Sequence, residues 1–261
     1  MDASYTHDYE QFELRHWWFV ARRGIIHDAL SRHTTSQMRW LDVGCGSGVL
    51  LHSYPAITNK LGLEMDGGSV ARAQAKGLDV RQVQPRWDFS EYGKFDLITL
   101  TDVIEHVEHE KEALDAVWNA LTGNGILLVT VPALMSLWSG HDVVNHHFRR
   151  YTRKTLLNVF PTDRWEVLET TYFSSFLLPM IWLARKLKNL WRGSDLSQST
   201  HDMKFGKMDW ALLRIFSTER WWLKFARFPL GSSVLLVARK KAVAETAVGN
   251  AHPAANEATA G

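Results

Sequence analysis

The chain has 261 residues, of which 46% are hydrophobic and 22% charged, a balance typical of a folded globular protein rather than a disordered one. Thirty Lys and Arg against 28 Asp and Glu leave a formal net charge of +2, which argues against a strongly basic surface that coats nucleic acid. Cys45 is the only cysteine, which excludes an internal disulfide, a thiolate zinc cage and a CxxC redox pair. We therefore expect a reducing, cytoplasmic setting, and the first residues, MDASYTHDYE, do not have the pattern of a secretion signal.

Helical and extended patterns follow one another along the chain. Residues 9–30 carry apolar side chains at helical spacing and predict one or two helices ahead of the sheet. From residue 39 onward, short apolar runs alternate with helical segments, which indicates a parallel sheet with helices on both faces. The predicted strands are 39–43, 60–64, 78–83, 95–101, 125–131, 165–173 and 232–240. Helices are expected between them at 48–54, 68–76 and 108–121, the last stopped by Gly123 and Asn124.

Four regions follow from this order. We expect an N-terminal helical cap at 1–36, a core formed by 37–173 and 232–241, a helical insertion or lid at 174–231, and a disordered tail at 242–261.

The apolar stretch 170–184 inside this order bears on membrane contact. It is interrupted by polar residues and a proline, and it is shorter than the ~20 residues that a membrane-spanning helix needs. Basic residues and tryptophans within 176–192 leave two interpretations. The segment is either a capping helix with a solvated basic face or a peripheral contact with the inner surface of an anionic membrane.

The most informative motif is LDVGCGSG at 41–48, where a predicted strand passes Asp42 and turns into a helix through glycines. Glycine tolerates a positive φ in a tight turn, and without a Cβ it lets a ligand approach the backbone closely. A phosphate-binding loop would require a lysine after these glycines, and none follows. The turn therefore indicates a nucleoside site of another kind.

Strand 60–64 ends at Glu64, a position from which a carboxylate can accept hydrogen bonds from the two hydroxyls of a ribose. Met65 follows and could pack against an adenine face. The alternative is that Glu64 is only a solvated residue at a strand end, an interpretation that the neighbouring glycine turn disfavours.

Four segments together resemble the class I S-adenosylmethionine (SAM)-dependent methyltransferases: LDVGCGSG at 41–48, LGLEMD at 61–66, FDLITLTDVIEHVEH at 95–109 and GILLVTVPA at 125–133. The resemblance implies an α/β, Rossmann-like fold with a seven-stranded, mostly parallel sheet whose last strand is antiparallel. It implies SAM as the cofactor, lying across the carboxyl ends of the first two strands. Predicted contacts are Gly44, Gly46 and Gly48 around the methionine part, and Glu64 and Met65 around the nucleoside. Asp42 is a further predicted contact with the cofactor.

The segments HWWFVARRGII at 16–26 and HHFRRYT at 146–152 are similar to other bacterial methyltransferases and distantly to quinone O-methyltransferases. In the latter, an arginine on the helix before the first strand holds the SAM carboxylate. Arg22 or Arg23 would take this role, for which a guanidinium fork is suited, unless both belong to a solvated helix face. The aspartate that many relatives place after the third strand is missing, and either Gln84 or Asp88 could substitute for it.

The segment after the fourth strand should lie at the ligand-binding edge of the sheet. Thr101 and Asp102 are expected near the amino-acid part of SAM, whereas His106 either contacts the ligand or packs inside the protein. Glu105 and Glu108 are interpreted as acidic residues favoured at the positive N-terminus of the next helix.

Segment 139–151 follows the fifth strand and is rich in histidine. A metal site is one interpretation, but methyl transfer from a sulfonium needs no metal, so a loop that hydrogen-bonds the acceptor is favoured and no metal is expected. His141 and His146 are the candidates for a general base, because a histidine pKa lies near working pH. Contact with the neighbouring Arg149, Arg150 and Tyr151, or with water, is the alternative.

The sequence thus predicts an enzyme that transfers a methyl group from SAM to a small molecule. The histidines favour a hydroxyl oxygen, and the tryptophans favour an aromatic, glycan-related or lipid-linked acceptor, because they can shield a site from water. Nucleic acid is not expected as a partner, and the oligomeric state is left open. The alternatives are a NAD-dependent oxidoreductase, disfavoured by the GxGxG spacing, and a non-catalytic SAM-binding protein, disfavoured by the intact loop and Glu64.

Overall fold

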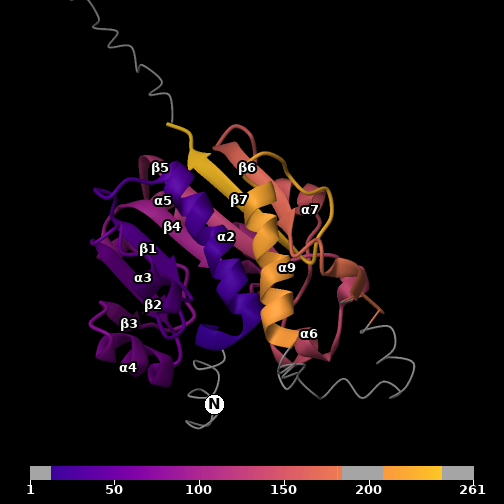
Figure 1. The fold of residues 1–261 in the computed structure, drawn as a ribbon. Coiled ribbons are helices and arrows are strands. Elements are labelled where there is room, and N and C mark those ends of the chain that lie inside the picture. The colour runs from indigo at the N-terminus through magenta and orange to yellow at the C-terminus, as the bar shows by residue number, and fades with distance from the viewer. Residues whose placement is uncertain (1–12, 181, 184–207, 243–261) are drawn as a thin grey trace, which may run out of the picture.

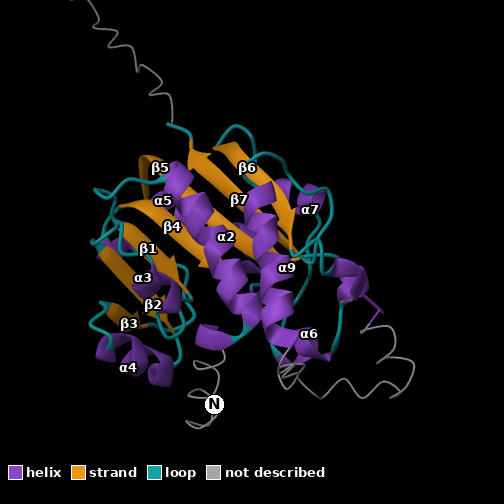
Figure 2. Cartoon of the chain, viewed as in Figure 1, coloured by secondary structure: helices purple, strands orange, loops and turns teal. Residues whose placement is uncertain are grey.

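The computed structural model describes residues 13–180, 182–183 and 208–242 as a sheet of seven strands surrounded by helices (Figures 1 and 2). The strands run in the order β3-β2-β1-β4-β5-β7-β6. Their bounds are β1 Trp40–Val43, β2 Lys60–Glu64, β3 Val80–Gln82, β4 Phe95–Thr101, β5 Leu121–Pro132, β6 Trp165–Phe173 and β7 Ser233–Lys240. The first five strands are parallel, and β7 lies antiparallel between β5 and β6. The predicted fold class is confirmed.

The described helices cover this sheet and connect its strands (Figure 2). Their bounds are α2 Trp17–His33, α3 Val49–Ser53, α4 Gly67–Ala75, α5 Glu110–Ala120, α6 Gly140–Val144, α7 Arg153–Leu157 and α9 Met208–Trp222. Single 3-10 turns occur at η1 Ser90–Tyr92, η2 Ile104–His106 and η3 Met135–Leu137. None of the described helices has the length and apolar character needed to cross a bilayer.

The central strands form the core because their apolar residues are covered on both faces. In β4, Phe95, Leu97 and Ile98 are fully buried, and the neighbouring β5 contributes an unbroken buried run from 125 to 131. A continuous apolar run of this kind is typical of a strand in the middle of a parallel sheet.

Helix α5 ends earlier than the sequence predicts. It stops at Ala120, and Leu121 is already extended and pairs with Phe95 of β4. Gly123 and Asn124 therefore lie inside β5 rather than forming a helix stop. The reason is tertiary, because Leu121 gains burial in the sheet, where it is 1% exposed.

Helices from opposite ends of the sequence lie side by side on one face of the sheet, α2 in violet and α9 in orange (Figure 1). The guanidinium of Arg220 in α9 donates two hydrogen bonds of 2.8 Å to the Asp28 carboxylate in α2, and the rings of Trp17 and Phe216 meet edge to face. Helix α2 is held near its C-terminus as well, because Arg32 donates to the buried carboxylate of Glu169 in β6. These contacts fix the helix that carries Arg22.

The division into cap, core, lid and tail stays a prediction. The described parts agree in order with it, since α2 precedes the sheet and α9 lies between β6 and β7. Residues 1–12 of the cap, 181 and 184–207 of the insertion, and 243–261 of the tail lie outside the described residues.

Candidate cofactor and acceptor site

The carboxyl ends of β1, β2, β4 and β5 meet at one edge of the sheet. Strand β1 has β2 on one side and β4 on the other, so the order of the strands reverses at β1. Open α/β sheets bind ligands at such a reversal, just beyond the carboxyl ends of the strands. The predicted site segments that follow these strands therefore reach the same edge.

The glycine turn after β1 has the backbone that its sequence predicts. Gly44, Gly46 and Gly48 all have positive φ, at 70°, 54° and 74°. A Cβ on Gly48 would lie 2.5 Å from the Leu78 side chain, whereas a Cβ on Gly46 would meet no atom within 4 Å. Gly48 is thus needed for close packing, and the backbone at Gly46 stays open to an approaching ligand.

The carboxylate of Glu64 lies directly against this turn. Its Oε2 accepts a hydrogen bond of 2.8 Å from the Gly46 N–H, and its Oε1 accepts from the N–H groups of Met65 and Asp66 at 2.7 and 2.9 Å. A carboxylate offers about four acceptor positions, so a further donor can bind at Oε2. Met65 exposes 57% of its surface beside it. The predicted ribose-binding acid and the glycine turn are thus joined directly, through the hydrogen bond from Gly46 to Glu64.

Of the two candidate arginines, only Arg22 reaches this edge. Its Nη2 lies 2.8 Å from the Asp102 carboxylate and donates to the Thr130 hydroxyl at 2.9 Å. The buried Nε of Arg22 has no hydrogen-bond partner among the described residues, so the guanidinium still has a donor for an anion. Arg23 instead donates to the backbone oxygen of Glu13.

Asp102 occupies a strained position right after β4, as its non-glycine φ of 58° shows. Its N–H donates to the carbonyl of Thr130 at 2.9 Å, and its carboxylate accepts from the Thr130 hydroxyl at 3.2 Å. These bonds to β5 hold the carboxylate against Arg22. Thr101, the last residue of β4, is half-buried at the same edge.

Asp42 does not face the open edge with these groups. It is 1% exposed, and one of its carboxylate oxygens accepts a hydrogen bond of 2.5 Å from Thr99 in β4. Burial raises the pKa of Asp42 to about 7. Its side chain therefore lies between the strands below the glycine turn, where it can support the turn.

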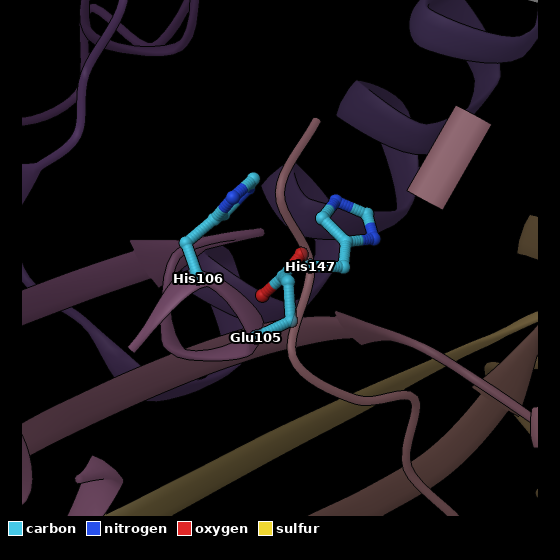
Figure 3. Close-up of side chains that lie close together, drawn as sticks. All are labelled: Glu105, His106 and His147. Atoms are coloured by element: carbon cyan, nitrogen blue, oxygen red, sulfur yellow. The ribbon is translucent and has the colours of Figure 1, made fainter. Parts of the chain in front are cut away.

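A second polar group lies beside this edge and combines residues after β4 with one from the loop after β5 (Figure 3). Glu105 and His106 belong to η2, and His147 follows α6. One ligand atom from each of the three lies within 4.8 Å of the others. The rings of His106 and His147 meet edge to face, with centroids 4.5 Å apart.

Glu105 is fully buried, and neither of its carboxylate oxygens has a hydrogen-bond partner among the described residues. Burial, with the charge of Asp102 adding to it, raises the pKa of Glu105 well above its ordinary value. The expectation that Glu105 favours the next helix N-terminus is wrong, because α5 begins at Glu110 and Glu105 lies in a separate turn.

His147 is oriented by a buried ion pair. Its Nδ1 lies 2.9 Å from Asp142, whose carboxylate also accepts from the Arg150 guanidinium at 2.7 and 3.0 Å. Burial alone would raise the pKa of Asp142, but the hydrogen bonds from His147 and Arg150 outweigh it and hold that pKa well below its usual range. The sequence singled out neither His147 nor Glu105 as site residues. The available signal was an acidic residue beside the apolar Ile104, shortly after an apolar run that predicts a strand.

The two predicted general bases differ in placement. His141 lies in α6, where Asn145 approaches its Nδ1 to 3.1 Å and its ring meets that of His147 edge to face at 6.0 Å. His146 is exposed and has a positive φ of 55°. His141 is thus close to the second polar group, whereas His146 faces solvent.

Comparison with known proteins agrees with this architecture. A family model described as a methyltransferase domain matches residues 14–169. The ubiquinone biosynthesis O-methyltransferase of Glaesserella parasuis is 26% identical over 141 residues, which cover 45% of this chain and 60% of that protein. The match therefore spans less than two thirds of this curated relative.

Two solved structures share the fold. A SAM-dependent methyltransferase from Archaeoglobus fulgidus has a TM-score of 0.52 at 16% identity, covering 84% of this chain and 94% of that one. The N-methyltransferase NodS from Bradyrhizobium japonicum, in complex with S-adenosyl-L-homocysteine, has a TM-score of 0.51 at 14% identity and covers 85% and 87%. The chain belongs to the methyltransferase-domain family, which confirms the class I SAM-dependent methyltransferases as its relatives and SAM as the predicted cofactor.

Proposed function

We propose that this protein transfers the methyl group of SAM to a hydroxyl oxygen of a small aromatic, glycan-related or lipid-linked molecule. The observation that carries the proposal is the hydrogen bond between the Glu64 carboxylate and the Gly46 N–H, because it joins the ribose-binding acid to the glycine turn. The name of the ubiquinone biosynthesis O-methyltransferase supports oxygen as the methylated atom.

Each residue at the edge of the sheet has a proposed task toward SAM. Glu64 accepts hydrogen bonds from the ribose hydroxyls through Oε2, and Met65 packs against the adenine. The backbone of Gly44, Gly46 and Gly48 lies along the methionine part. Arg22 binds the carboxylate with its unpartnered Nε and its Nη1, while Asp102, held by Arg22 and Thr130, faces the ammonium.

SAM supplies a methyl group already activated by the positive charge on sulfur, so the protein must align the acceptor with the S–CH3 bond and keep water out. A hydroxyl acceptor reacts faster when its proton is removed. We assign this proton transfer to His141, whose ring meets that of His147, a member of the second polar group, with centroids 6.0 Å apart. His146 is the less favoured base because it faces solvent.

Methyl-labelled SAM and fractionated extract of the source organism test the proposal. We expect label in a small-molecule fraction with the wild type and a strong loss of label with His141→Ala, whereas His146→Ala should label nearly as well. An unlabelled extract together with undetectable binding of SAM and S-adenosylhomocysteine would refute the assignment. Tight binding of NAD would favour the oxidoreductase alternative instead.

Peripheral contact with an anionic membrane is a further part of the proposal. Residues 184–192, which carry the basic side chains of this segment, lie outside the described residues. Its support comes from aromatic side chains on and after α9, of which Trp210, Trp221 and Phe225 are 65%, 62% and 74% exposed, beside the exposed Arg214 and Lys224. Co-sedimentation with vesicles containing phosphatidylglycerol should pull the protein down, and vesicles of phosphatidylcholine alone should not. If the protein sediments with neither kind of vesicle, or equally with both, this part of the proposal is contradicted.

A further inference from the structure

The group of Glu105, His106 and His147 lies beside the predicted cofactor site, and of the three only His106 was predicted to contact the cofactor (Figure 3). It contains the chemical set of two imidazoles and one carboxylate. This set of side chains binds divalent transition metals. It occurs in zinc sites with three protein ligands and an open fourth position, and in the facial triads that hold iron. Figure 3 shows the Glu105 carboxyl group between the two histidine residues, and one ligand atom from each of the three lies within 4.8 Å of the others.

The burial of Glu105 supports a cation at this point. The residue is 0% exposed, and both carboxylate oxygens lack a partner among the described residues. A buried polar group without a hydrogen bond costs several kcal/mol, and a protonated carboxyl would still leave an O–H without an acceptor. A divalent ion satisfies the carboxylate oxygens directly.

The surroundings of the two histidines support the same conclusion. Metal-binding histidines usually use their second ring nitrogen to bond a carboxylate or a backbone carbonyl, which fixes the ring. The Nδ1 of His147 bonds the Asp142 carboxylate, which Arg150 holds in turn, so Nε2 remains for a metal. The ring of His106 meets that of His147 edge to face, with centroids 4.5 Å apart, which holds the two imidazoles close to each other.

We propose that Glu105, His106 and His147 bind one divalent transition-metal ion, with zinc as the expected type. The ligand atoms lie within 4.8 Å of one another, and a tetrahedral zinc ion with bonds of about 2.1 Å requires spacings of about 3.4 Å. The sequence disfavoured a metal in segment 139–151, and only His147 of that segment takes part, together with two residues that follow β4.

The fourth coordination position gives the site a role, and this role rests on the proposed function. An acceptor hydroxyl bound there would be held by the ion and would lose its proton more readily. The site would then favour acceptors that present an oxygen, such as phenols, to the ion.

Metal titration of the full-length, untagged protein tests the site without any turnover. After treatment with EDTA and dialysis, Zn²⁺ is added in a calorimeter and Co²⁺ is followed by visible absorbance. We expect one ion per chain and an absorbance typical of a four- or five-coordinate cobalt site. Glu105→Gln and His147→Ala should each weaken binding at least 100-fold. His109→Ala, which removes a nearby exposed histidine, should leave it unchanged.

Asp142→Asn provides a separate test of the positioning of His147. We expect a loss of metal affinity of about 10–100-fold, typical of outer-shell partners. Thermal unfolding of each metal-free variant shows whether it is folded, and His106→Ala replaces any variant that is not. A wild type that binds no ion, or a Glu105→Gln variant with wild-type affinity and cobalt spectrum, would overturn the proposal. Metal binding without methyl transfer would refute the proposed function and leave the metal site standing.

Discussion

Replacing Glu64 by alanine tests the contact on which the cofactor site depends. The carboxylate is placed to accept hydrogen bonds from the ribose, and hydrogen bonds to charged groups contribute about 1.5–3 kcal/mol. A loss of about 2–3 kcal/mol corresponds to a rise in the Kd for SAM of roughly 30–150-fold. The N–H groups of Gly46, Met65 and Asp66 also lose their acceptor, but water can reach this edge and replace it.

Calorimetry with both SAM and S-adenosylhomocysteine makes the test specific. Both carry the same ribose, so Glu64→Ala should weaken the two by the same factor. A larger loss for SAM would mean that Glu64 acts on the sulfonium charge instead. Glu166→Ala is the matched control, because it removes an exposed carboxylate from edge strand β6, where it pairs with Arg239. An unchanged Kd in a folded Glu64→Ala protein would refute the cofactor site.

Three further predictions follow from single contacts. Arg22→Met should raise the Kd for SAM about 10–100-fold, whereas Arg23→Met should change it less than threefold, both measured by the same calorimetry. Gly48→Ala should lower the free energy of unfolding, measured in urea, by about 2 kcal/mol or more, because position 48 has a positive φ and the new Cβ would also clash with the Leu78 side chain. Gly77→Ala should cost only about 1 kcal/mol, because position 77 has a positive φ but no atom within 4 Å of the new Cβ. Burial raises the pKa of Glu219 to about 7, so the fold favours the protonated acid; the contribution of this group to stability is complete below about pH 4.5 and decreases by about 3 kcal/mol as the pH rises toward 7. Glu219→Gln should make the fall of the free energy of unfolding between about pH 4.5 and 7 smaller by about 3 kcal/mol, while Asp42 and Glu105, whose pKa values are also raised, keep their share of it. Denaturation curves with equal pH dependence in both proteins would contradict the prediction.

The sequence by itself determined the parallel sheet, the glycine turn and the acid at the end of β2. These features are local, because alternating apolar runs, glycines with positive φ and a residue at a strand end depend on neighbours along the chain. The carboxyl ends of parallel strands meet at one edge, so the meeting of Glu64 with the turn followed from strand order alone.

Tertiary packing decided those features of the site in which segments far apart in the sequence meet. Arg22 and Arg23 are equivalent in sequence, and only the direction of α2, fixed by its contacts with α9 and β6, turns Arg22 toward Asp102. Helix α5 ended at Ala120 because β4 buries the next leucine. Glu105 and His147 are joined across 42 positions by the fold. The pKa of a buried carboxyl group depends on the groups packed around it, and no local sequence pattern specifies those groups.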